Sequence, residues 1–117
     1  MSKMKLRVNP EAISDLSDIK RYIRDELYNP DAADRVVNDI IKAYKGLKDF
    51  PLKGPALDSV ITIKTDFRYL VCGSYYIFYK AEKELISIYR VINARRDYIR
   101  ILFGRTLSGT TEFEDDM

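Results

Sequence analysis

Three short apolar segments in the last third of the chain, joined by very short connections, constrain the fold more than any other feature. Arg68–Cys72, Tyr75–Ala81 and Leu85–Asn93 are rich in tyrosine, isoleucine, phenylalanine and valine, which favour β-strands. The connections Gly73-Ser74 and Glu82-Lys83-Glu84 leave room only for tight turns. Three strands joined in this way should be antiparallel neighbours in one sheet. Such a sheet needs a second layer to bury its apolar face.

The N-terminal half predicts that layer. Lys5–Asn9 alternates as a short strand, and two helix starts follow, at Asn9-Pro10 and Asn29-Pro30. Each start offers an asparagine cap, a proline at the first helical position and an acid in the first turn. Apolar residues then recur at helical spacing, and the short joint at Tyr28-Asn29 makes the two helices antiparallel neighbours. Their outer faces are mixed in sign and are expected to form an ordinary solvated surface; they comprise Asp15, Asp18, Arg21, Arg24, Asp25, Asp34, Asn38, Lys42 and Lys45.

These elements predict an α+β domain of order β-α-α-β-β-β(β), an antiparallel sheet with a helical hairpin packed on one face. Val60–Lys64 is expected as a further strand, and residues 94–103 as a final helical turn or an extended arm. A chain of 117 residues suits one domain, which we assign to residues 1–105. Residues 106–117 carry four acids and no base, a composition that predicts a disordered acidic tail.

Positive charge is concentrated in the sheet-forming half. Residues 61–105 contain nine basic side chains against four acidic ones, and residues 1–105 carry a net charge of +6. Such an excess suits a polyanionic or acidic partner. The alternative is a small basic domain whose lysines and arginines are simply solvated.

The residue types that are missing exclude several kinds of chemistry. The chain has no histidine and a single cysteine, Cys72, which argues against an internal disulfide, a zinc site and a Ser-His-Asp triad. Cys72 lies in an apolar strand segment and is expected to be a small core residue. No apolar run approaches the ~18 residues of a membrane span, and no secretory signal is visible. We therefore expect a soluble, cytoplasmic protein without metal or cofactor.

The segments Tyr75–Ala81 and Ile86–Asp97 resemble the C-terminal motif of the RelE/ParE superfamily of bacterial toxins. That motif reads like YRIFYRV followed by VEILRVLHGARD, and the matching residues here are YYIFYKA and ISIYRVINARRD. The resemblance covers most of the chain, because the upstream order of elements also fits. It implies a growth-inhibiting toxin of a type II toxin–antitoxin (plasmid stabilisation) module, neutralised by a cognate antitoxin. Members attack either the translating ribosome or DNA gyrase.

The candidate site residues are cations near the end of the sheet. Strict alternation would place Arg90 on one face with Ile86, Ile88 and Ile92. There it is either an edge charge satisfied by a carboxylate or a guanidinium aimed at phosphate. The binding residues expected are Lys64, Arg68, Arg90, Arg95, Arg96 and Arg100. If the protein is a nuclease, the catalytic residues expected are Arg95 and Arg96, as cations on the phosphate, and Tyr98, stacking a base or relaying a proton.

The chain departs from the ribosome-dependent nucleases where those enzymes place cations. By the resemblance, Tyr76 stands in place of an arginine, and Phe67 and Tyr69 in place of two lysines. These departures favour ParE-like gyrase poisoning. The alternatives are a RelE-like ribosome-dependent mRNA endoribonuclease and a non-toxic regulatory binding domain. The strand aromatics can form a base-stacking platform or pack in the core; they are Tyr69, Tyr75, Tyr76, Phe78, Tyr79 and Tyr89.

Overall fold

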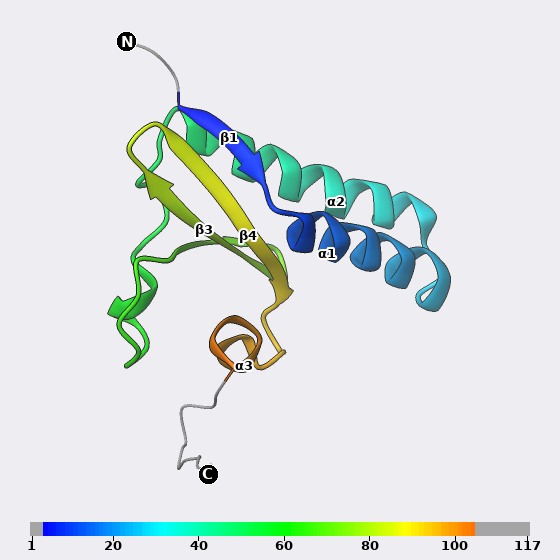
Figure 1. The fold of residues 1–117 in the computed structure, drawn as a ribbon. Helices are drawn as coiled ribbons and strands as arrows, with labels where there is room; N and C mark the ends of the chain where they lie inside the picture. Colours follow the sequence, from blue (N-terminus) through cyan, green and yellow to red (C-terminus); the bar gives the residue numbers. More distant parts are fainter. Residues whose placement is uncertain (1–3, 105–117) are drawn as a thin grey trace.

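The computed structural model describes residues 4–104 and shows one four-stranded sheet with helices packed on it (Figure 1). The strands are β1 (Lys5–Val8), β2 (Arg68–Cys72), β3 (Tyr75–Glu82) and β4 (Leu85–Asn93), in the order β1-β4-β3-β2. β2, β3 and β4 are antiparallel neighbours, as predicted, whereas β1 pairs with β4 in parallel. The predicted α+β fold is therefore confirmed, with a mixed sheet in which only the β1–β4 pair is parallel.

In the sequence, a helical hairpin lies between β1 and the other three strands. Helix α1 (Pro10–Arg21) continues into a π-helical turn, η1 (Tyr22–Glu26), and α2 (Pro30–Lys45) continues into a 3-10 turn, η2 (Gly46–Lys48). The Oδ1 atom of Asn29 caps α2 by accepting a hydrogen bond from the Ala32 amide at 3.1 Å. Asn9 makes no such side-chain bond, so only the second predicted cap is present.

The hairpin covers one face of the sheet and forms the first core with it (Figure 1). The apolar spacing of both helices explains this arrangement, because residues three or four positions apart share one helix face. The buried members of this core are Ala12, Leu16, Ile19, Ile23, Ala33, Ile40, Tyr44, Leu47, Ile77, Tyr79, Ile86, Ile88 and Val91.

The opposite face carries a second, aromatic core. Its buried members are Leu57, Phe67, Phe78 and Ile92. The final helix, α3 (Tyr98–Phe103), packs on this core, which resolves the choice left open for residues 94–103 in favour of a helical turn. The Oδ1 atom of Asp97 caps α3 by accepting from the Arg100 amide at 3.2 Å. The sheet is therefore covered on both faces.

A bulge in β4 corrects the predicted division of that strand into two faces. Tyr79 pairs with Ile88 and Phe78 with Arg90, so Tyr89 has no partner on β3. Such an extra residue reverses the side-chain alternation beyond it. Ile86, Ile88 and Val91 consequently lie in the first core and Ile92 in the second. The expectation that Arg90 and Ile92 share a face with Ile86 and Ile88 is wrong.

The predicted strand Val60–Lys64 is also wrong. This segment forms bends after a 3-10 turn, η3 (Leu57–Ser59), and pairing with the edge of β2 is made further upstream, where Ala56 bridges Arg68.

The buried Tyr79 side chain fixes that upstream loop. Its hydroxyl donates to the Pro51 carbonyl oxygen and accepts from the Gly54 amide, both at 2.9 Å. A side chain at Gly54 would clash with the carbonyl oxygen of Tyr69, so the close approach of the loop requires glycine. The β-branched residues of Val60–Lys64 favour a strand, but the edge they would pair with is already taken.

Among residues 4–104, no helix is long and apolar enough to cross a bilayer. The predicted tail, residues 106–117, lies outside the described residues.

Removing residues 106–117 should leave the fold intact, together with the growth inhibition that the resemblance implies, because the described residues alone form both cores. We expect the circular dichroism spectrum to be unchanged and the unfolding midpoint to stay within about 5 °C, since a shift of that size corresponds to about 1 kcal/mol in a domain of this length. Loss of soluble, folded protein on truncation after Arg105 would show instead that the tail is structural.

Candidate functional site

A partly buried ion pair joins α1 to the second half of β4. Arg90 donates from Nε and Nη2 to the two carboxylate oxygens of Asp15, each at 2.8 Å. The Asp15 Oδ2 atom also accepts from the Val91 amide at 2.9 Å. β1 ends at Val8, opposite Ile88. Beyond Ile88, β4 is no longer paired with β1, and the Asp15 carboxylate binds this edge of β4 at the Val91 amide.

The ion pair with Asp15 determines the protonation and the hydrogen bonding of Arg90. The hydrogen bonds that Arg90 donates to Asp15 raise the pKa of Arg90 above its usual value, with the negative charges of Asp15 and Glu11 adding to the effect and partial burial opposing it. The guanidinium is thus occupied by a carboxylate. Its predicted role in binding a partner remains a prediction, and the structure places it in a structural ion pair.

A groove of about 430 Å³ lies beside this pair, between α1 and the start of the segment that follows β4. Arg95 and Arg96 line it, and neither guanidinium makes a hydrogen bond or ion pair with any described residue. The two acids in the groove are already engaged, Asp15 with Arg90 and Asp18 with Arg21. The complete lining is Asp15, Asp18, Ile19, Tyr22, Tyr75, Val91, Asn93, Arg95 and Arg96. The groove therefore combines the apolar surfaces of Ile19, Tyr22 and Val91 with two positive charges that no described residue neutralises.

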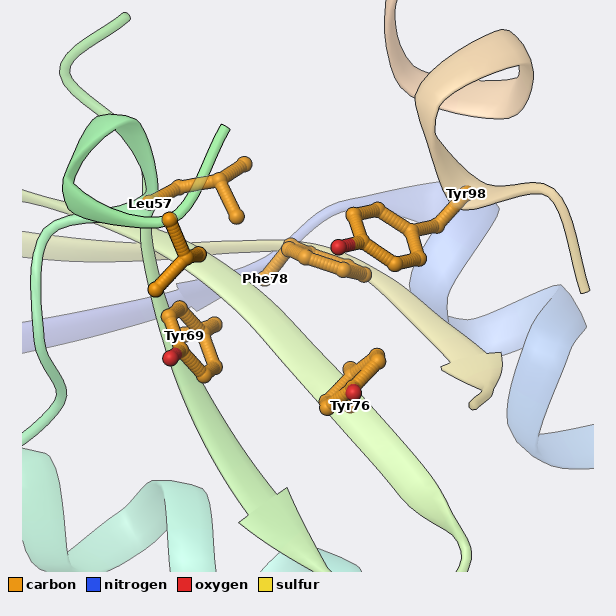
Figure 2. A pocket seen from close by; sticks show the side chains of 6 residues that line it. Leu57, Tyr69, Tyr76, Phe78 and Tyr98 are labelled. Atoms are coloured by element: carbon orange, nitrogen blue, oxygen red, sulfur yellow. The ribbon is translucent and has the colours of Figure 1, made fainter. Parts of the chain in front are cut away.

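The other face of the sheet holds a second, aromatic cavity of about 210 Å³. Figure 2 shows Tyr98, at the start of α3, leaning over Phe78, with Tyr69 and Tyr76 projecting from two neighbouring strands. The Tyr98 ring centroid lies 5.3 Å from those of both Tyr76 and Phe78. Leu57 and Val60 complete the lining. The six lining side chains supply three hydroxyls and no positive charge.

The hydroxyls of this aromatic cavity suit proton donation. Burial raises the pKa of Tyr98, and the neighbouring Tyr76 and Tyr69 add to the effect. Tyr98 therefore stays protonated at neutral pH and can donate a hydrogen bond, but it is poorly suited to act as a general base.

Lys80 also lies on the aromatic face, outside the cavity. Its ammonium is 3.2 Å from Asp66 and lies 4.7 Å and 5.1 Å from the ring centroids of Phe67 and Tyr89. It is held by an acid and two aromatic rings, an arrangement that stabilises the cation locally.

The structure does not bring the predicted site residues together. Arg95 and Arg96 line the groove beside α1, whereas Tyr98 lines the cavity on the other face. Lys64 lines a separate hollow with Asp58. The Arg68 Nε atom donates to the Gly54 carbonyl oxygen at 2.7 Å. The three residues proposed for catalysis thus do not share one cavity.

The remaining predicted cation, Arg100, is exposed on α3. Its Nε atom lies 3.8 Å from an oxygen of Asp97, one helical turn away. Such an exposed pair contributes little to stability and leaves the side chain accessible.

Asp15 is the important residue that sequence reasoning misplaced. It was expected on the solvated outer face of the first helix, yet it is 8 % exposed. The signal was present, because Asp15 is three residues after Ala12 and four before Ile19, both buried. An acid at that spacing lies on the core-facing side and needs a buried partner, which Arg90 supplies.

Comparisons with known proteins point to one family. Residues 6–98 match the family model described as the ParE toxin of the type II toxin–antitoxin system parDE. A solved structure titled as the chromosomal ParDE toxin–antitoxin system from P. aeruginosa contains a similar chain, with a TM-score of 0.66 and 22% sequence identity. That match covers 78% of this chain and 96% of the other. No curated protein matches the sequence.

Proposed function

The chain belongs to the ParE toxin family of type II toxin–antitoxin systems, and we propose that it inhibits growth by binding DNA gyrase without cleaving messenger RNA. Neutralisation by a cognate antitoxin in the bacterial cytoplasm, within a plasmid-stabilisation module, is part of the same proposal. Because toxins of this family are neutralised by an antitoxin, the protein needs a surface that binds another protein in addition to any site for its target.

The aromatic cavity carries the proposal. By the resemblance, Tyr76, Phe67 and Tyr69 stand where the nuclease branch of the superfamily has cations, and all three pack in the aromatic core of the sheet. Cleavage of RNA requires positive charge on the phosphate as it becomes pentacoordinate. A cavity lined by three tyrosines, Phe78 and two aliphatic residues supplies none, so binding without hydrolysis fits its chemistry better.

Purified gyrase provides the direct test of this target. We expect the protein to inhibit supercoiling of relaxed plasmid, or to accumulate cleaved DNA–gyrase complexes, and we expect pre-incubation with the antitoxin to abolish the effect. A protein that arrests growth but leaves gyrase unaffected would reject the proposed target. A protein that causes no arrest when expressed without its partner would support the alternative of a non-toxic binding domain.

The groove beside α1 is the surface that we propose for the antitoxin. Within residues 4–104, its Arg95 and Arg96 guanidiniums have no partner, and Ile19, Tyr22 and Val91 add apolar surface to its lining. An acidic, partly apolar segment, either extended or helical, would match both features. Partners of this kind bind through pairs of opposite charge that also accelerate association.

Charge reversal tests the antitoxin surface. The R95E/R96E variant should bind antitoxin at least about tenfold more weakly, and the remaining binding should depend less on salt, because two attractive charges become repulsive. The matched control is K42E/K45E on α2, which changes the net charge equally on the outer helix face. If the α2 variant loses more affinity than the groove variant, the antitoxin occupies a different surface.

A further inference from the structure

The groove beside α1 has a second candidate occupant within this same chain. Both of its acids are tied to neighbouring arginines, so the two remaining arginines, Arg95 and Arg96, attract any mobile negative charge nearby. Ile19, Tyr22 and Val91 add an apolar surface beside them. Tyr22 is 53% exposed, so part of that surface is open to an aromatic or aliphatic side chain.

The described chain ends eight residues after Arg96, with α3 packed on the opposite face of the sheet from this groove. Tyr98, the first residue of α3, is two positions after Arg96, and α3 contains six residues, which span about 9 Å. Gly104, at φ 74°, ends the helix in the left-handed conformation and turns the chain out of it. The seven residues 105–111 reach about 23–25 Å when extended. Along the chain, Gly104 lies at most about 20 Å from Arg96. Residue 112 can therefore reach the end of the groove at Arg96.

The sequence that follows is complementary to the groove. Glu112, Glu114, Asp115 and Asp116 surround a single aromatic residue, Phe113. Four acids next to one aromatic side chain match two arginines that have no partner among residues 4–104 and that lie next to apolar lining residues.

We propose that residues 112–116 dock in this groove, with Phe113 against Ile19, Tyr22 and Val91 and the flanking carboxylates on Arg95 and Arg96. The docked segment competes with other acidic ligands. A short tether gives the tail an effective concentration in the millimolar range, so even weak intrinsic binding lowers the apparent affinity of an acidic competitor by about threefold to tenfold. The docking itself does not depend on the proposed target. Only its effect on antitoxin binding rests on the proposed function.

A spin label on the tail of the full chain tests the docking. Cys72 is the only cysteine, so a C72A/T110C variant carries one nitroxide close to the acidic segment. At low salt, we expect the amide signals of Ile19, Tyr22, Arg95 and Arg96 to broaden by paramagnetic relaxation. The amides of Lys42 and Lys45 on α2 serve as the reference surface.

Three further variants distinguish specific docking from mere proximity of a tethered tail. In the labelled chain, R95E/R96E should reduce the broadening at Ile19 and Tyr22 at least about threefold, as expected for loss of a weak tethered contact. Neutralising the tail (E112Q/E114Q/D115N/D116N) should do the same, whereas K42E/K45E should leave the broadening unchanged.

Broadening that is equal on α2 and in the groove, or that survives both charge changes, overturns the docking. Unchanged amide spectra away from the tail show that each variant is folded. No gyrase, RNA or antitoxin is present in these measurements, so a negative result leaves the proposed function untouched.

Discussion

Replacing Asp15 by alanine should lower the free energy of unfolding by about 3 kcal/mol, a large part of the stability of a small domain. The variant removes three hydrogen-bond acceptor contacts at once, two from Arg90 and one from the Val91 amide. It leaves Arg90 without its partner and the Val91 amide without an acceptor. The estimate lies at the low end of the range for broken buried pairs because the Arg90 side chain is 26% exposed and keeps some contact with water.

Urea denaturation of the wild-type and variant chains measures the effect, with the midpoint falling and the slope unchanged. Asp18→Ala is the matched control. Asp18 lies one turn away, pairs with Arg21, and is 60% exposed at its side chain, so its loss should cost less than about 1 kcal/mol.

The double variant D15A/R90A should lose less stability than the sum of the two single variants, because each single change strands the other charge. If Asp15→Ala is no more destabilising than Asp18→Ala, the ion pair does not hold α1 to the sheet.

The sequence predicted the fold wherever local patterns and packing agree. The hairpin connections at Gly73-Ser74 and at residues 82–84 leave antiparallel pairing as the only geometry, and the apolar spacing of residues 12–27 fixes which helix face meets the sheet. These features depend on neighbours close in sequence, so they can be recognised without knowing the rest of the structure.

The errors arise where distant residues decide local structure. Val60–Lys64 has the composition of a strand, but the edge of β2 is occupied because Tyr79, in the middle of the sheet, holds the Pro51–Gly54 loop against it. The bulge at Tyr89 likewise depends on the register with β3. Neither the absence of a strand at Val60–Lys64 nor the bulge at Tyr89 can be recognised from the residues of the segment in which it occurs.

The candidate site was predicted only in part, for the same reason. The arginine pair at residues 95 and 96 was identified by its charge, and its side chains do line a groove. The spatial separation of Tyr98 from that pair follows from the packing of α3 on the aromatic face. Arg96 and Tyr98 are only two positions apart, and the residues of this short segment do not indicate that the chain passes from one face of the sheet to the other.

Messenger RNA in translating extracts should keep its ends unchanged when this protein is added. At most two cations could approach a scissile phosphate from the groove beside α1, and the aromatic cavity offers none of its own. Loss of each stabilising contact to a charged transition state costs roughly 10²–10³ in rate. Tyr76, Phe67 and Tyr69 replace two or three such contacts, so cleavage slower by at least about 10⁴-fold is expected.

Primer extension across the initiation region and the following codons measures this directly, with a ribosome-dependent nuclease of the superfamily as the positive control. The Arg96→Ala variant is the internal check. Codon-phased cuts that appear with the wild-type chain and disappear with Arg96→Ala would assign the protein to the ribosomal branch. They would also require Arg96 to turn from the groove toward Tyr98 when the ribosome is bound, because the two side chains line different cavities in the free protein.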